Sequence, residues 1–310
     1  AGIFFAGYAL FEVPSNLILA RVGARRWIAR IMVTWGLLSV AMMFVEGKWS
    51  FYTLRFALGV AEAGFLPGIL YYLSHWFPRA ERARAVSWFM LGIPLSTVFG
   101  GPLAGVLLGL DGWHGLQGWQ WLFVLEGLPA VVLGVVTWLW LPDSPRQVRW
   151  LSAEEQAHVF LRVEQEAQAT RARHAGSGSL RTALLHPTVW LLALVLFACQ
   201  CGSYGLTLWM PQIVKGISGQ GNLTVGFISA IPYIGAALAM LYVGASSDRS
   251  GERFWHVALP SFIGAAGFAV SALHLSPVPA MVAPTIAAMG DLSTRGPSWA
   301  LPPRRLHAGA

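Results

Sequence analysis

Nearly all of the chain is divided into apolar runs long enough to cross a lipid bilayer, and this pattern limits the possible folds more than any other feature. A helix rises 1.5 Å per residue, so about 20 residues span a hydrocarbon core about 30 Å thick. Only 11% of the 310 residues are charged, against about 25% in soluble domains. The pattern predicts an all-α membrane protein with about nine spans, at roughly 2–20, 28–45, 51–77, 86–110, 119–141, 188–214, 224–246, 256–275 and 278–301.

The basic residues indicate which ends of these helices face the cytoplasm. If the first run leads from outside to inside, the inner loops hold 17 of the 21 Lys and Arg residues. The outer loops hold Lys48 and Lys215, while Arg55 and Arg295 lie inside apolar runs. This asymmetry follows the positive-inside rule. The net charge of +7 therefore orients the protein in the bilayer, and we expect no nucleic-acid partner.

A short motif, R-x-G-x-R-x-W, occurs at Arg21–Trp27 and again at Arg249–Trp255, with an offset of 228 residues at every shared position. A repeat with one fixed offset indicates an internal duplication. Applied to Pro187, where the second half begins, the offset places the equivalent first helix before Ala1. Applied to the end of the first half, it leads beyond Ala310. We therefore expect a fragment of a longer chain.

The same offset predicts three regions. Residues 1–142 form the N-terminal half, with helices two to six, and residues 188–310 form an incomplete C-terminal half, with helices seven to ten. Residues 143–187 form a cytoplasmic connection. Within it, Ser152–Glu155 (SAEE) predicts a capping box that opens an amphipathic helix, and Arg171–Ser179 (RARHAGSGS) predicts a flexible linker.

Motifs of enzymes and of cofactor sites do not occur in the sequence. There is no H-E-x-x-H, no P-loop and no G-x-S-x-G. Cys199 and Cys201 are two residues apart, which on a helix points them in different directions, and they form no metal-binding set. We therefore expect neither an enzyme nor a metal or cofactor.

Four stretches carry a resemblance to a known family: FEVPSNL (Phe11–Leu17), RFALGVAEAGFLPG (Arg55–Gly68), WLFVLEGLPA (Trp121–Ala130) and LPDSPR (Leu141–Arg146). With them the chain resembles the major facilitator superfamily, and within it the anion:cation symporters that carry organic acids such as tartrate and phthalate. The resemblance implies two six-helix halves that are parallel repeats. It extends from about residue 1 to 285 and weakens after Pro284.

The repeated motif is similar to that superfamily's cytoplasmic loop signature, G-x-x-x-D-R-x-G-x-R. The resemblance implies that the paired loops latch the cytoplasmic helix ends, although an anchoring role in topology alone stays open. In the first copy, Ala20 stands where the signature has Asp. The candidate loop residues are Arg21, Gly23 and Arg25 in the first copy, and Asp248, Arg249, Gly251 and Arg253 in the second.

Charged residues inside apolar runs need a reason, because each costs about 2.5–3.5 kcal/mol on insertion scales. Arg55 and Glu62 share one predicted helix and are seven residues, or about two turns, apart, so they face the same way. A guanidinium can hold a carboxylate with two parallel hydrogen bonds, and a membrane-embedded carboxyl group can carry a proton. The resemblance implies substrate binding for Arg55, proton coupling for Glu62 and a cavity-facing position for Tyr8. A structural ion network is the alternative.

The second half offers fewer candidates. Gln200 and Tyr204 lie on its first helix, where they are candidates for the opposite wall of a substrate cavity, with core packing as the alternative. Asp291 and Arg295 are four residues apart and can pair on one helix face, but their role is open. Gly101–Gly105 faintly resembles an antiporter motif, and a kink at Pro102 explains it equally well.

We expect a monomeric secondary transporter that imports a small organic carboxylate together with H+ by alternating access. Hydroxy acids, sugar acids and aromatic acids all fit, and Na+ is an alternative to H+. An excess of Arg over Lys, 19 to two, favours a bacterial source and hence the bacterial inner membrane. Two other functions stay open: proton-driven drug export, and a truncated remnant or sensor-like protein that transports nothing.

Overall fold

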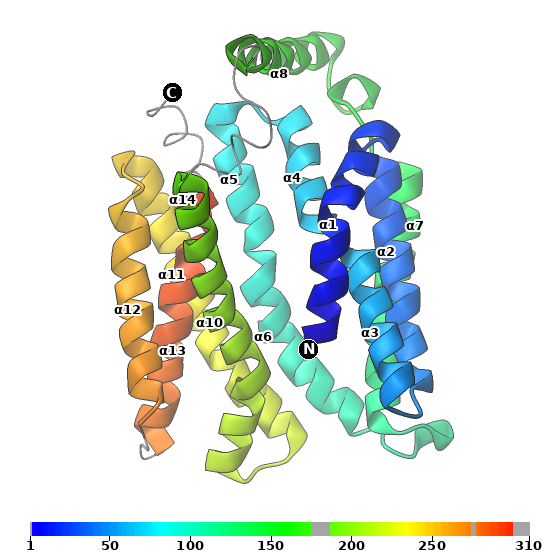
Figure 1. Ribbon diagram of the computed structural model, residues 1–310, viewed down its shortest axis with the longest axis vertical. Helices are drawn as coiled ribbons and strands as arrows, with labels where there is room; N and C mark the ends of the chain where they lie inside the picture. The colour runs from blue at the N-terminus through cyan, green and yellow to red at the C-terminus, as the bar shows by residue number, and fades with distance from the viewer. Residues whose placement is uncertain (1, 175–186, 274–276, 300–310) are drawn as a thin grey trace. The chain divides into compact units, whose positions relative to one another are not determined.

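The computed structural model describes residues 2–174, 187–273 and 277–299, which are helical through most of their length (Figure 1). The helices are α1 (Gly2–Val22), α2 (Ala24–Ala41), α3 (Lys48–Glu62), α4 (Phe65–Trp76), α5 (Arg79–Met90), α6 (Gly92–Leu108), α7 (Gly118–Trp140), α8 (Ala153–His174), α10 (Pro187–Ser218), α11 (Asn222–Ser250), α12 (Trp255–Ser271), α13 (Pro277–Ser293) and α14 (Arg295–Trp299). Short 3-10 turns occur at Met42–Phe44, Trp113–Gly115 and Pro145–Gln147. The predicted all-α fold is confirmed.

Each predicted apolar run coincides with one helix or with two consecutive helices. Among the described residues, seven helical segments have the length and hydropathy of membrane spans. The helix Trp255–Ser271 is apolar but shorter, so the predicted number of nine is approximate. Large apolar side chains are exposed on these helices, for example Phe99 (70%), Trp140 (80%) and Trp190 (66%). Such a surface is suited to contact with lipid, and the chain is an integral membrane protein.

Three of the predicted runs are interrupted in the structure, and the run at 278–301 is divided into α13 and α14 at Thr294. The run at 51–77 is divided into α3 and α4 at Ala63 and Gly64, and the run at 86–110 is divided into α5 and α6 at Leu91. The physical reason is a proline early in each second helix, since Pro67 and Pro94 have no N–H to donate to the carbonyl four residues before. Hydropathy does not register such breaks: Lys48–Trp76 and Arg84–Leu108 each still have the length and hydropathy of one membrane span.

Packing divides the chain into two compact units, which we describe separately. Unit 1 consists of Ala1–Arg82 and Leu107–Ala172, and unit 2 of Ala83–Val106 and Arg173–Ala310. The predicted halves rest on the sequence repeat rather than on packing, so their boundaries stay a prediction. Most of the predicted linker at 171–179 lies outside the described residues.

Unit 1 is built from two closely packed helix pairs, α2 with α7 and α1 with α3. Glycine allows the first pair to approach, because a Cβ atom at Gly36 would lie 2.8 Å from the backbone oxygen of Gly127. Small residues at such crossings are typical of membrane helix pairs. The second pair positions the candidate site described below.

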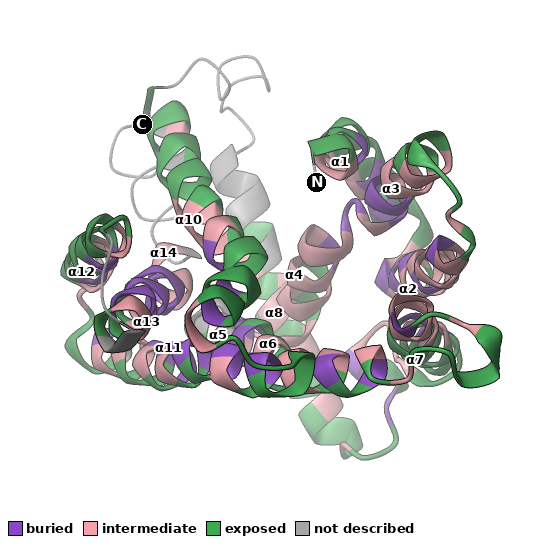
Figure 2. Ribbon diagram, turned by 90° about the horizontal axis from the view of Figure 1, so that it is seen from below, coloured by how far each residue is buried: buried purple, intermediate pink, exposed green. Residues whose placement is uncertain are grey.

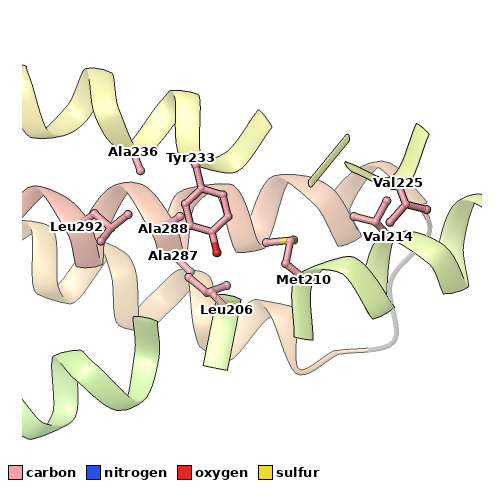
Figure 3. Packing of buried hydrophobic residues seen from close by; sticks show 9 residues of the cluster. All are labelled: Leu206, Met210, Val214, Val225, Tyr233, Ala236, Ala287, Ala288 and Leu292. Atoms are coloured by element: carbon pink, nitrogen blue, oxygen red, sulfur yellow. The ribbon is translucent and has the colours of Figure 1, made fainter. Parts of the chain in front are cut away.

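Unit 2 is centred on α13, which packs against α11 and α12. Figure 2 shows α13 largely buried and α10 largely exposed. Helix α6 meets α11 at glycines, since a Cβ atom at Gly101 would lie 3.0 Å from the backbone oxygen of Gly226. This contact gives the Gly101–Gly105 stretch a packing role. The core cluster, drawn in Figure 3, comprises Leu206, Met210, Val214, Val225, Tyr233, Ala236, Ala287, Ala288 and Leu292.

Candidate functional site

The crossing of α1 and α3 brings Tyr8 next to the helix that carries Arg55 and Glu62. A Cβ atom at Gly7 would lie 2.5 Å from the backbone oxygen of Phe56, and one at Gly59 would lie 3.0 Å from the backbone nitrogen of Tyr8. The two backbones are therefore in contact at a point between Arg55 and Glu62. Three of the candidate residues predicted from the sequence thus come from one helix crossing.

Arg55 is partly buried, and its environment is short of acceptors. Its guanidinium carbon lies 5.2 Å from the centre of the Phe51 ring, one turn earlier in α3. Its Nε atom is buried and has no hydrogen-bond partner in the structure, and no ion pair to a described carboxylate is present. A guanidinium carries five N–H donors. Arg55 therefore keeps donors available for an anion.

Glu62 is the last residue of α3 and lies at the break before α4. Gly64 begins α4 with φ 86°, a left-handed conformation that favours glycine. Because Pro67 cannot donate to the carbonyl of Ala63, the hydroxyl of Ser15 donates to it instead, at 2.6 Å. An interrupted helix in a membrane is tolerated where such partners replace the lost bonds. Glu62 is thus held at an irregular point of the backbone, partly buried.

Ser15 also joins this break to the cytoplasmic loop, because its oxygen accepts a hydrogen bond from Trp27 Nε1 at 2.9 Å. The turn between α1 and α2 is the single residue Gly23, with φ 94°. The backbone N–H of Arg25 donates to Asp143 Oδ1 at 3.1 Å, and Arg25 Nε lies 3.5 Å from Asp143 Oδ2. A carboxylate thus reaches this loop even though Ala20 supplies none.

Sequence reasoning missed the role of Asp143, although LPDSPR was among the family stretches. The contact joins residues 118 positions apart, and no local pattern indicates it. Arg21, the remaining candidate of the first loop, is exposed.

The second loop is organised around Ser247. Its hydroxyl donates to the backbone oxygen of Glu252 at 2.8 Å and accepts from Arg253 Nη1 at 2.9 Å. Gly251, with φ 66°, ends α11, and Glu252 accepts the N–H of Trp255 at the start of α12. Arg249 is exposed, and the side chain of Asp248 lies outside the described set. In both copies the glycine of the motif has a positive φ, Gly23 as a one-residue turn and Gly251 as the first residue of the four-residue turn 251–254.

The two candidate residues of the second half, Gln200 and Tyr204, have different surroundings. Gln200 Oε1 accepts a hydrogen bond from Nη1 of Arg295, on α14. The side chain of Tyr204 is 42% exposed. The structure therefore joins Gln200 to a polar cluster that contains Ser203, Asp291 and Arg295. Sequence reasoning left the last two without a role, because only the fold brings α10 to residues about 90 positions later.

Membrane-length helices joined at their ends by a matched pair of arginine-containing turns define a multi-pass membrane protein. The model of the Major Facilitator Superfamily matches residues 1–310, and the chain belongs to this family. The match includes the segment after Pro284, where the sequence resemblance weakens. Family membership confirms the predicted major facilitator fold and the prediction that the protein is not an enzyme.

Two curated relatives are similar over nearly the whole chain. One, a provisionally named tartrate transporter of Agrobacterium vitis, is 48% identical over 302 residues, which cover 97% of this chain and 66% of the relative. The other, a quinolone resistance transporter of Acinetobacter baumannii, is 44% identical over 307 residues, which cover 99% and 70%. The chain therefore spans about two thirds of the length of these relatives.

A solved structure shows the same fold. It is a bacterial homologue of the human lysosomal transporter Spinster, in an inward-facing and occupied conformation. The TM-score is 0.67 at 18% identity, over 96% of this chain and 63% of that one. At this identity the likeness concerns the fold alone.

Proposed function

We propose that the protein is a secondary transporter that imports a small organic carboxylate together with a proton, by alternating access, across a bacterial inner membrane. The observation that carries this proposal is Arg55, a partly buried guanidinium whose Nε has no hydrogen-bond partner. A positive charge in such a place is costly. An entering carboxylate can satisfy it with two parallel hydrogen bonds.

Tyr8 and Glu62 complete the proposed site. Tyr8 lies at the crossing of α1 with α3, from which its hydroxyl can select substrates that carry a further polar group. Glu62, at the helix break, is the proposed proton carrier, with Na+ as the alternative coupling ion. The name of the Agrobacterium vitis relative supports a carboxylate substrate, since tartrate is a hydroxylated dicarboxylate. We propose that the protein acts as a monomer.

Drug export is the second candidate function, and the name of the Acinetobacter baumannii relative favours it. Quinolone drugs themselves carry a carboxyl group, so Arg55 can bind them by the same chemistry. The two functions differ in the direction of movement. Uptake driven by an inward proton gradient identifies the symporter, whereas accumulation of a quinolone in everted vesicles identifies the exporter.

The test is uptake of radiolabelled tartrate by the protein in proteoliposomes, with the outside acidified. We expect uptake that collapses when a protonophore is added. Arg55→Gln should abolish uptake, and Glu62→Gln should uncouple it from the pH gradient. The control is Lys48→Gln, which removes an exposed charge at the start of the same helix. Unchanged pH-driven uptake in Arg55→Gln would refute the proposed site.

A further inference from the structure

A buried polar cluster in unit 2 joins α10 to the end of α13 and the start of α14. Arg295 Nη1 donates to Gln200 Oε1, and Arg295 Nη2 donates to Ser203 Oγ at 2.6 Å. The Ser203 hydroxyl in turn donates to Asp291 Oδ2. The side chains of Arg295 and Asp291 are only 14% and 5% exposed. Two opposite charges are therefore enclosed with two neutral polar groups.

This arrangement does not satisfy the guanidinium in the way a structural ion pair does. Arg295 Nη2 lies 3.7 Å from Asp291 Oδ2, which is too long for a hydrogen bond. Both short bonds from the guanidinium go to neutral side chains, and Arg295 Nε is buried without any partner. Charged groups form their strong hydrogen bonds with ionised partners in bidentate geometry. That capacity of Arg295 is unused.

The surroundings contain few competing charges. Two ionisable side chains of neighbouring helices lie near Asp291, Cys199 on α10 and Tyr233 on α11, and both are neutral in their ordinary form. The Tyr233 hydroxyl is already bonded to Thr207, at 3.2 Å. Lys215, the only basic residue of α10, is 15 residues beyond Gln200. Within α10, α13 and α14, Arg295 and Lys215 are thus the only Arg or Lys residues.

We propose that Arg295, Gln200 and Ser203 form a carboxylate-binding site within unit 2, in which Asp291 is the internal anion that an entering carboxylate displaces. Gln200 and Ser203 are neutral, so they yield their hydrogen bonds from Arg295 to an anion at little cost. A carboxylate that takes their place gains both Nη groups, or Nη and Nε, of one guanidinium. The inference rests on the proposed transport of organic carboxylates and names a second group that binds them.

The test is equilibrium binding of radiolabelled tartrate to the full chain in lipid nanodiscs, in an Arg55→Gln background that removes the first site. We expect Arg295→Gln to weaken binding by about tenfold or more, because charge-assisted hydrogen bonds are lost. We expect Asp291→Asn to strengthen binding, because the competing anion is removed. The control, Lys215→Gln, removes an exposed charge from α10, the helix that carries Gln200 and Ser203, and should change nothing.

The opposite directions of the two effects separate binding from structure. If the pair only held helices together, each single variant would leave one buried charge unpaired, and both would impair binding in the same direction. That result would overturn the proposal. The double variant Asp291→Asn/Arg295→Gln leaves no buried charge, so it should fold, and it should bind as weakly as Arg295→Gln. Binding at the level of the background in the double variant, or no tartrate binding by the background itself, would also overturn the proposal.

Failure of this inference is distinguishable from failure of the proposed function. If Arg55→Gln abolishes uptake while Arg295→Gln leaves binding unchanged, the inference is wrong and the transport site stands. If the two unit 2 variants shift binding in opposite directions while the parent protein shows no proton-driven uptake, the carboxylate site stands and the symport mechanism is wrong.

Discussion

We expect Gly7→Ala to force α1 away from α3 and to displace Tyr8 from the helix that carries Arg55. The new Cβ atom would lie 2.5 Å from the backbone oxygen of Phe56 and 3.2 Å from the backbone nitrogen of Val60. Ordinary contacts of carbon atoms begin at about 3.5 Å, so the helices must separate by roughly 1 Å. Backbone atoms on both sides leave no flexible side chain that could move aside.

The loss of folding stability in Gly7→Ala is the balance of two opposing effects. Overpacking of this kind destabilises by about 1–3 kcal/mol, while alanine in place of glycine in a helix returns about 0.5–1 kcal/mol. A net loss of about 1–2 kcal/mol should lower the thermal midpoint of the purified protein in detergent, and tartrate affinity should fall with it. The matched control is Gly100→Ala in α6, where nothing lies within 4 Å of the new atom. Equal midpoints and equal affinities for the two variants would refute the helix crossing as the determinant of the site.

Three further perturbations test separate contacts. Ser15→Ala leaves the carbonyl of Ala63 without a donor, so we expect a loss of about 1–3 kcal/mol, measured as a lower thermal midpoint; Ser15→Thr should restore most of it. Asp143→Asn should cost at most about 1 kcal/mol, because the ion pair is partly exposed, but it should speed proteolysis of the first cytoplasmic loop. The pKa of Glu155 is lowered by the hydrogen bonds from the backbone and side chain of Ser152. The charge-dependent part of the cap therefore stabilises α8 above the ordinary glutamate pKa and is lost as the pH falls through the lowered value. Glu155→Ala should therefore speed amide exchange in the first turn at neutral pH and make less difference in acid.

Much of the fold could be predicted because the membrane requires a simple pattern. Each span must present about 20 apolar residues, and the inner loops must hold the basic ones. The positions of the apolar and basic residues along the chain are therefore enough to predict the spans and their orientation. The capping box at Ser152 was also predictable and is confirmed, since Ser152 and Glu155 exchange hydrogen bonds. Such features depend on residues within one turn of each other.

The breaks at Ala63 and Leu91 and the cluster at Arg295 lie beyond this kind of reasoning. The hydropathy of an apolar run is the same whether its helix is continuous or interrupted, and only Pro67 and Pro94 indicate these two breaks. The contact between Gln200 and Arg295 spans 95 residues, and it depends on how α10 lies against α13. The placement of Arg55 and Glu62 on one helix could be predicted, because the two residues are seven positions, or about two turns, apart within one apolar run.

The groups that contact Arg25, Arg295 and Arg55 differ, and this difference ranks the three arginines by how readily each can bind an anion. Arg25 has a carboxylate, Asp143, within 3.5 Å and close to the surface, so its charge is already balanced and a further anion gains little. Arg295 has a carboxylate 3.7 Å away but bonds to neutral groups, so an anion must compete there. For Arg55, the structure shows only a ring beneath the guanidinium. An anion that enters unit 1 therefore meets the least competition at Arg55, and this ranking predicts that Arg55→Gln reduces carboxylate binding more than either Arg25→Gln or Arg295→Gln does.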